Sequence, residues 1–142
     1  MLALVVSLGL LGAPVSFAVE DAKEKEGLAL FEKKIRPVLV ENCYRCHSSD
    51  AIKANRLKGG LRLDTRESLL SGGDSGAAVV PGKGAESLLV RALRHDGDLK
   101  MPPKAKLPSG VVADFVKWID MGAPDPREDD APAVERSKID IC

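Results

Sequence analysis

The chain has 142 residues, which is enough for one domain of ordinary size and too few for two. Hydrophobic residues make up 44% and charged residues 30% of the sequence, so it can bury a core and is not a disordered tail. Lys plus Arg equals Asp plus Glu at 21 each, and this balance excludes the strongly basic field expected of a nucleic-acid-binding protein.

The first 18 residues carry no charge and are rich in Leu and Val. Ser16-Phe17-Ala18 has the small-x-small pattern of a signal-peptidase site, and acidic residues begin soon afterwards at Glu20. We therefore predict a signal peptide over residues 1–18 and export to the periplasm or an equivalent extracytoplasmic compartment. No stable membrane span is expected after cleavage. The basic residues that usually precede such an apolar run are missing, so an uncleaved anchor is the alternative.

A helical pattern begins after a charged stretch. Residues 19–26 are rich in charge and poor in apolar side chains, so we expect a short solvated lead-in. Apolar residues then recur at helical spacing over residues 28–39. Pro37 falls inside this run and lacks a backbone N–H, so a kink or break is expected near Ile35-Arg36.

Glycine and other small residues dominate residues 48–84. Within them, one short helix is predicted from Asp64 to Leu70, with Asp64 or Thr65 as its N-cap. Another helix is predicted over residues 86–94, because its leucines and alanine gather on one face and its arginines on the other.

The last predicted helix has clear ends. It follows a loop over residues 95–108 that is punctuated by glycine and proline. Ser109 is expected as its N-cap, Gly122 as the first residue beyond it, and Pro124 as the residue that stops it. No segment alternates apolar and polar residues as a strand does, so the predicted fold class is all-α.

The sharpest motif in the sequence is Cys43-Tyr44-Arg45-Cys46-His47. Two thiols at this spacing can form thioether bonds to the two vinyl groups of one porphyrin, and the adjacent imidazole then lies beneath the iron. Covalent haem attachment occurs on the export side of the membrane, in agreement with the predicted signal peptide. The motif therefore predicts one covalent haem c and its iron, bound through Cys43, Cys46 and His47.

Three other kinds of site could use these residues. A disulfide between Cys43 and Cys46 would close a very small, strained loop and leave His47 unexplained. A dithiol redox motif is expected in a βαβ context, which the sequence lacks. A zinc ion needs four ligands, and adding His95 and Cys142 supplies no second closely spaced pair. Haem is the interpretation that the motif favours.

The iron of such a haem needs a sixth ligand or keeps an open position. Met101 precedes Pro102-Pro103 in an otherwise polar loop, and a stiff loop of this kind can hold a weak, soft thioether ligand at a fixed distance. We therefore expect His47 and Met101 as the metal ligands. A second imidazole from His95, or an open site, is the alternative.

Residues 31–126 resemble the planctomycete-type cytochrome c domain, a branch of the class I cytochromes c. The pieces that carry the resemblance are I-R-P-V-L-V-E-N-C-Y-R-C-H, K-G-G-L-R-L-D-T-R-E-S-L-L-S-G-G-D-S-G, V-V-P-G-K, S-L-L-V-R-A-L, L-K-M-P-P-K and V-K-W-I-D-M-G-A-P. The resemblance implies Cys43 and Cys46 as attachment points, His47 as proximal ligand and Met101 as distal ligand. It also implies the class I fold, with helices and Gly/Pro-rich loops around one haem and the first and last helices crossing beside it.

The predicted function is one-electron transfer with redox partner proteins, not enzyme catalysis. The haem domain of a larger secreted oxidoreductase, a peroxidase-like enzyme, and a haem with a structural role are the alternatives. Lys100, Lys104 and Lys106 could steer an acidic partner or simply solvate their loop. Family members usually continue into two further large domains. Here we assign the cytochrome domain to residues 27–126 and an acidic, disordered tail to residues 127–142. The chain is therefore either a fragment of a longer protein or a stand-alone cytochrome.

Overall fold

The computed structural model describes residues 16–127, with side chains described from residue 19. No strand occurs in this part of the chain, which contains only an isolated bridge between Gly73 and Gly76, and the all-α prediction is confirmed. Nearly all of the predicted signal peptide, and the tail from residue 128 with Cys142, lie outside the described residues. The elements are α1 (Ser16–Leu30), the π-helical η1 (Phe31–Ile35), α2 (Arg36–Asn42), α3 (Ser49–Lys53), α4 (Arg66–Ser71), α5 (Leu88–Arg94) and α6 (Ser109–Asp120).

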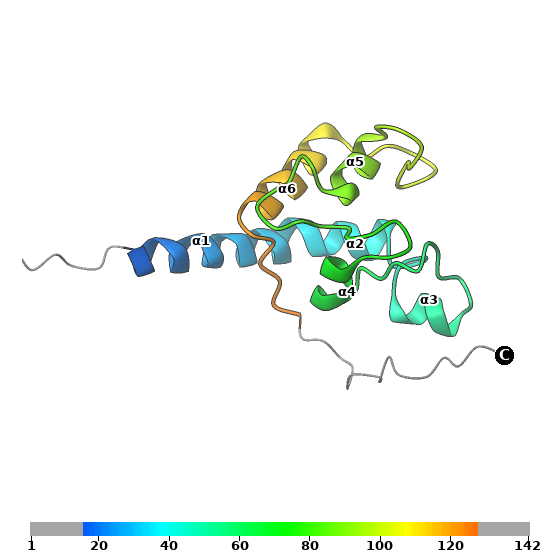
Figure 1. Cartoon of the computed structure of the whole chain (residues 1–142), viewed down its shortest axis with the longest axis horizontal. Helices are drawn as coiled ribbons and strands as arrows, with labels where there is room; N and C mark the ends of the chain where they lie inside the picture. Colours follow the sequence, from blue (N-terminus) through cyan, green and yellow to red (C-terminus); the bar gives the residue numbers. More distant parts are fainter. Residues whose placement is uncertain (1–15, 128–142) are drawn as a thin grey trace, which may run out of the picture.

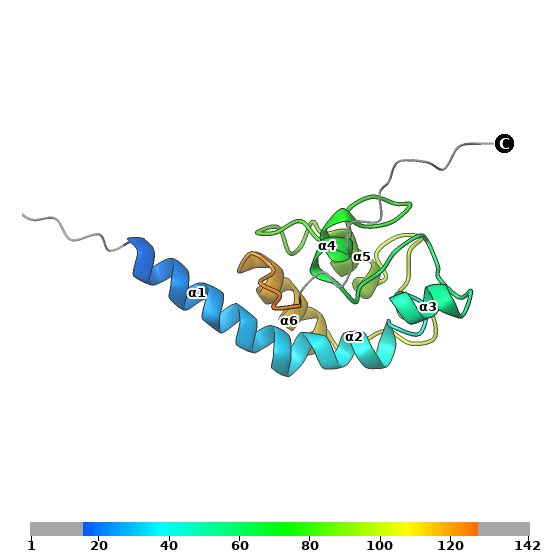
Figure 2. The same ribbon diagram turned by 90° about the horizontal axis from the view of Figure 1, so that it is seen from below.

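The elements α1, η1 and α2 follow one another directly and form one long helical rod (Figure 1). Figure 2 shows that α1 projects beyond the other helices. Residues 19–26 belong to α1, so the predicted lead-in is helical, and its side chains are exposed as expected. None of the helices in the described part of the chain is long and apolar enough to cross a membrane.

The helix changes type where the sequence predicts a kink. In η1 the backbone N–H of Arg36 donates to the carbonyl of Phe31, which closes a wider turn than that of an α-helix. Pro37 follows directly. It has no N–H to donate, and its ring would crowd the carbonyl of Lys33 in a regular α-helix. The wider turn relieves that conflict, so the helix continues past the proline.

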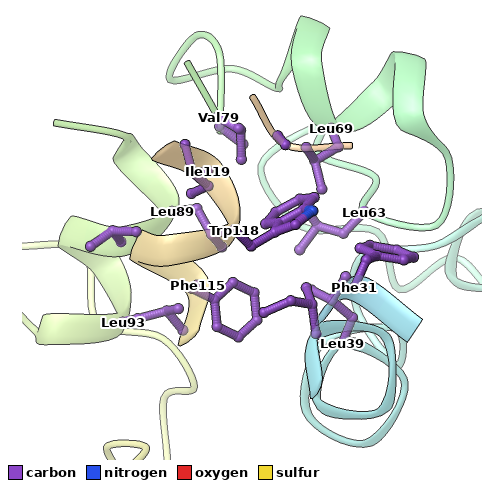
Figure 3. Packing of buried hydrophobic residues seen from close by; sticks show 14 of the residues in the cluster. Phe31, Leu39, Leu63, Leu69, Val79, Leu89, Leu93, Phe115, Trp118 and Ile119 are labelled. Atoms are coloured by element: carbon purple, nitrogen blue, oxygen red, sulfur yellow. The ribbon is translucent and has the colours of Figure 1, made fainter. Parts of the chain in front are cut away.

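The core forms where α6 packs against η1. The ring of Trp118 lies 5.4 Å from that of Phe31 and 6.4 Å from that of Phe115, measured between centroids, and all three side chains are buried (Figure 3). The Trp118 Nε1–H donates to the Pro124 carbonyl at 2.8 Å, so its polar atom is satisfied. The first part of the chain and the last helix therefore cross, as the resemblance implies.

The C-terminal end of α6 matches the prediction, whereas the N-terminal end differs from it. Ser109 is the first helical residue and not the N-cap, because Pro108 occupies the cap position. The Pro108 carbonyl accepts the N–H groups of Val111 and Val112, and no side-chain cap bond forms. Gly122 follows the helix with φ +103°, a conformation that favours glycine, as predicted.

The segment before α5 contains one helix that the sequence analysis missed. The predicted helix is α4, in which the Thr65 side chain accepts from the N–H of Ser68 as an N-cap. The additional helix is α3, capped in the same way by Ser48, whose hydroxyl accepts from the N–H of Ala51. Ser48, followed by an acidic first turn at Asp50, is the signal that could have revealed it.

Two glycines permit close approach to the last helix and the chain beyond it. A Cβ atom on Gly27 would lie 2.3 Å from Pro124 Cγ, and one on Gly84 would lie 2.6 Å from the Val116 carbonyl oxygen. The Gly84 N–H also donates to Asp120 Oδ1 at 2.7 Å. The long loop that precedes α5 is thereby fastened to α6.

Replacing Trp118 by Ala should lower the free energy of unfolding by roughly 3–5 kcal/mol, because it deletes a fully buried aromatic ring. Denaturant unfolding followed by far-UV circular dichroism measures the change. Ile52→Ala is a suitable control, since Ile52 is 50% exposed and should change stability by no more than about 0.5 kcal/mol. Equal effects of the two substitutions would contradict the packing described above.

Candidate cofactor site

An apolar cavity of about 340 Å³ opens between the end of α2, the loop before α4, the loop before α5, α5 itself and the loop that follows it. Cavities of this size are typical of small-molecule and cofactor sites. Cys43, Cys46, His47 and Met101 all line it, so the structure brings together the four residues that the sequence analysis selected. Most of the other lining residues are apolar or glycine, among them Leu61, Leu63, Gly73, Ala78, Leu89 and Leu93.

The two cysteines and the histidine share one tight turn at the end of α2. The Cys43 N–H donates to the Leu39 carbonyl, which ends the helix, and the Cys43 carbonyl accepts from the N–H groups of Cys46 and His47 at 3.1 and 2.9 Å. Both thiols are free. Burial raises the pKa of Cys43 to about 11, as expected for a thiol on an apolar wall.

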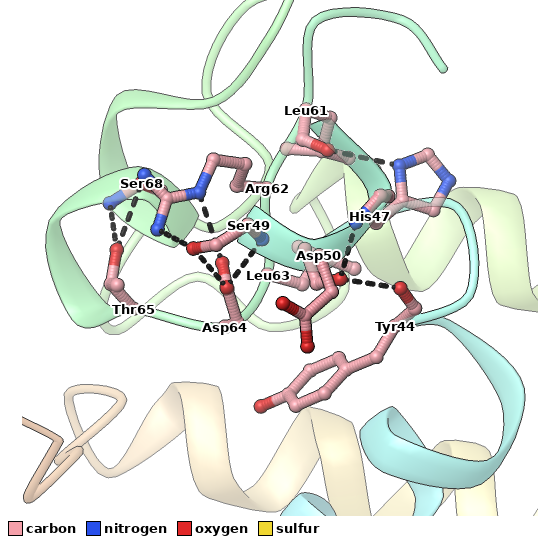
Figure 4. A network of polar contacts seen from close by, with 12 residues as sticks. Tyr44, His47, Ser49, Asp50, Leu61, Arg62, Leu63, Asp64, Thr65 and Ser68 are labelled. Carbon is pink, nitrogen blue, oxygen red and sulfur yellow. Dashed lines mark hydrogen bonds and ion pairs between the residues drawn. The ribbon is translucent and has the colours of Figure 1, made fainter. Parts of the chain in front are cut away.

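His47 is held at both its side chain and its backbone. Its Nδ1 lies 3.1 Å from the carbonyl oxygen of Leu61, and a carbonyl can only accept, so Nδ1 carries the proton (Figure 4). The His47 carbonyl accepts from the N–H of Leu63 at 2.9 Å. The imidazole is thus in the tautomer whose Nε2 has a free lone pair, which is what a metal ion requires of this side chain.

A polar network supports the segment that carries Leu61 and Leu63. Asp64 Oδ2 accepts from the backbone N–H and the hydroxyl of Ser49, each at 2.6 Å (Figure 4). Arg62 Nε donates to Asp64 Oδ1 at 3.1 Å, and its Nη2 donates to the Ser49 hydroxyl at 2.6 Å. Burial alone would raise the pKa of Asp64, but these hydrogen bonds from Ser49 and Arg62 outweigh it and lower the pKa.

Met101 lines the cavity from the loop that follows α5. Its backbone N–H donates to the Ala92 carbonyl at 3.0 Å, which ties the loop to the end of α5. The helix stops at His95, which adopts the left-handed conformation at φ 58°. His95 does not line the cavity, and its Nε2 is buried without a hydrogen-bond partner. Between residues 16 and 127, no group of three or more His, Cys, Asp or Glu side chains could hold a metal ion.

A buried ion pair near the site escaped the sequence analysis. Arg127 lies just beyond the residues assigned to the domain, yet only 9% of its side chain is exposed, and Asp125 is fully buried. Asp125 Oδ1 accepts from the backbone N–H and Nε of Arg127 at 3.0 and 2.8 Å, and Oδ2 also accepts from Nη2. Pro126, which favours extended backbone in the residue before it, is the signal that these two side chains share one side of the chain.

Arg127 also contacts the Cys-x-x-Cys-His motif, through Tyr44. Arg127 Nη1 donates to the Tyr44 hydroxyl at 2.5 Å and to the Leu63 carbonyl at 2.6 Å, and the guanidinium carbon lies 4.8 Å from the centre of the Phe31 ring. Burial alone would lower the pKa of Arg127, but Asp125 and Tyr44 outweigh it and raise the pKa, so this side chain stays charged.

An all-α domain in which a Cys-x-x-Cys-His turn and a methionine line one apolar cavity has the features of a cytochrome c. Residues 43–105 match the family described as Planctomycete cytochrome C, and the chain carries a planctomycete-type cytochrome c domain. Such domains bind haem, transfer electrons and typically work outside the cytoplasm. No curated protein and no solved structure matches the chain. The matched residues include all four cavity residues selected from the sequence and end before α6 and Arg127.

Asp64→Asn should reduce stability near pH 7 by about 1–3 kcal/mol, because its side chain loses the charge that accepts from Ser49 and Arg62. The pKa of Asp64 is lowered in the folded state. The stability from its ionised form is therefore present above the unfolded value, about 3.9, and is lost as the pH falls through the folded pKa.

Urea unfolding of the wild type and Asp64→Asn at pH 7 and in acid tests this expectation, and the difference between the two proteins should shrink in acid. Glu86→Gln removes the same charge from an exposed pair with Lys83 and should have little effect at either pH. A difference for Asp64→Asn that does not change with pH would show that its charge is not what stabilises the network.

Proposed function

We propose that this chain is a mono-haem c-type cytochrome that carries single electrons. Cys43 and Cys46 attach one haem c covalently, and His47 and Met101 are the axial ligands of its iron. The observation that carries this proposal is the shared cavity, because residues far apart in the sequence meet around one apolar space with the donor atoms that a His/Met haem requires.

The residues fit the group that the family implies. A porphyrin is large and apolar, and the cavity walls are mostly leucine, alanine, proline and glycine. The two thiols sit together in one turn at its edge, in the spacing that thioether attachment needs. The hydrogen bond from His47 to the Leu61 carbonyl selects the tautomer able to bind a metal ion through Nε2.

The chain's own residues then determine the chemistry. When bound, the haem supplies an iron that gains and loses one electron. The hydrogen bond from His47 Nδ1 to the Leu61 carbonyl would make the imidazole a stronger electron donor to the iron and so favour the ferric form. Met101 offers a soft thioether that favours the ferrous form, and the apolar walls disfavour the additional charge of the ferric form. If His47 and Met101 both bind the iron, they would leave no position for a substrate, which supports a carrier over an enzyme.

The enzyme alternative depends on a polar group beside an open iron position. His95 is the second imidazole of the chain, and it lies outside the cavity lining. His95 is therefore not placed to supply the acid-base group that peroxide chemistry would need. The carrier proposal includes export of the protein and redox partner proteins. The exposed Lys100, Lys104 and Lys106 lie near Met101 and favour an acidic partner that docks weakly.

Covalent attachment predicts that acid-acetone extraction leaves the haem colour with the protein. Mass spectrometry should show the mass of one haem added to the chain. Cys43→Ala combined with Cys46→Ala should release the colour into the solvent, because both thioether bonds are lost. Colour lost from the wild type would overturn covalent attachment. A mass corresponding to two haems would overturn the single site.

The ligand assignment is tested by Met101→Ala. A methionine bound to ferric iron gives a weak charge-transfer band in the near-red, and this substitution should abolish the band, lower the reduction potential and allow the ferrous protein to bind CO. His95→Ala is the matched control and should leave all three properties unchanged. If His95→Ala changes them and Met101→Ala does not, His95 is the ligand. Rapid CO binding by the wild type would replace the carrier proposal by the peroxidase-like one.

A further inference from the structure

We propose that Arg127 is a positioning residue for His47, and that it sets the reduction potential of the site from outside the cavity. It does so by holding the segment that accepts the imidazole hydrogen bond. This inference rests on the proposed function, since His47 must be an iron ligand for its orientation to affect the potential. Arg127 lies beyond the residues that match the cytochrome family, and it does not line the cavity.

Arg127 uses the two ends of its guanidinium group differently. One edge, with Nε and Nη2, is bound by the Asp125 carboxylate. The other end, Nη1, donates to two oxygen atoms from different parts of the chain, the Tyr44 hydroxyl and the Leu63 carbonyl. A planar fork can make these contacts together, whereas the ammonium of lysine cannot reproduce that geometry. Arg127 therefore joins the attachment turn to the segment at Leu63.

The Leu63 backbone connects this arginine to the histidine. Its carbonyl accepts from Arg127 at 2.6 Å, and its N–H donates to the His47 carbonyl at 2.9 Å. Two residues earlier, the Leu61 carbonyl accepts the Nδ1–H of His47 at 3.1 Å. A displacement of Leu63 must move both hydrogen bonds of His47, because the same short backbone segment makes them.

Arg127 is connected to the core through the residues that precede it. Asp125 is fully buried and pairs with Arg127, and the preceding Pro124 carbonyl accepts the indole N–H of Trp118. The guanidinium group also stacks on Phe31. A buried ion pair is a poor source of net stability, because desolvation offsets the attraction. The contacts of Arg127 instead favour a geometric role, since each nitrogen of its guanidinium group donates to an acceptor.

Arg36 provides a matched control within the same fold. Its guanidinium carbon lies 5.5 Å from the centre of the same Phe31 ring, on the rod. It pairs with Glu32 in a salt bridge whose side chains are 38% and 42% exposed. The two arginines thus share the residue type and the ring contact, whereas the bonds to Tyr44 and Leu63 come from Arg127.

Positioning and simple charge predict opposite shifts of the potential. The hydrogen bond to Leu61 would make His47 a stronger electron donor to ferric iron, so loosening that bond should raise the reduction potential. Removing a positive charge would also stabilise ferric iron, and by itself would lower the potential. Arg127→Lys keeps the positive charge but loses the planar guanidinium geometry, and Arg127→Gln loses both. Under the proposal, both variants raise the potential.

The experiment uses the haem-loaded protein with redox titration and amide hydrogen exchange. In Arg127→Lys and Arg127→Gln, exchange of the Leu63 N–H should accelerate by about tenfold or more relative to that of Met101, whose N–H is bound by the Ala92 carbonyl and not by the Leu63 segment. Arg36→Gln removes a partly exposed charge that is paired with Glu32, so it should leave both exchange rates unchanged and should not raise the potential. Tyr44→Phe removes one Arg127 contact without altering charge, so it should give a smaller rise in potential. That variant also keeps the test available if the Arg127 variants do not fold.

Three outcomes would overturn the inference. A potential that falls in Arg127→Gln and is unchanged in Arg127→Lys indicates a charge effect. Equal acceleration of exchange at Leu63 and Met101 indicates general destabilisation. Unchanged potentials in both Arg127 variants and in Tyr44→Phe exclude a positioning role. These outcomes differ from a failure of the proposed function. If the wild type holds its haem and shows the near-red band, the proposed function stays intact. If the wild type shows neither, the proposed function itself is overturned.

Discussion

The packing of Trp118 against Phe31 joins the two ends of this domain, and the other parts are arranged around it. The contact holds α6 against the π-helical part of the rod, and the indole N–H draws the chain after α6 back through the Pro124 carbonyl. Because Asp125 and Arg127 follow within three residues, the same contact determines where the guanidinium lies. The core is therefore connected to the cofactor site through a few consecutive residues, without a long intervening loop.

The site is built mainly from backbone hydrogen bonds on short segments. His47 is held by the backbone of Leu61 and Leu63, and Met101 is held by the Ala92 carbonyl. Such bonds restrict the positions of the two candidate ligands. Three aromatic rings, those of Phe31, Phe115 and Trp118, pack at the helix crossing, and none of them lines the cavity. Leu63, Ala78, Leu89 and Leu93 belong both to the core and to the cavity walls, so core packing and the cofactor site share one layer of aliphatic residues.

Agreement between sequence and structure is closest where the chemistry is local. The cap at Thr65, the change of helix type before Pro37 and the αL residue at Gly122 each follow from one or two residues, because proline, glycine and a capping hydroxyl act on their own turn. The sequence analysis missed the helix α3 and the Pro108 cap because each depends on a single residue. The neighbouring residues favour other local structures, and their preferences compete with that residue.

The sequence by itself determined the all-α class, the motif that contains Cys43, Cys46 and His47, and Met101 as a candidate ligand, since residue types and their spacing carry that information. Only the tertiary structure decided that Met101 lines the same cavity while His95 does not, and that Arg127 reaches Leu63. The physical reason is distance along the chain. Contacts between residues far apart in sequence depend on how the rod and α6 cross, and no local pattern encodes that crossing.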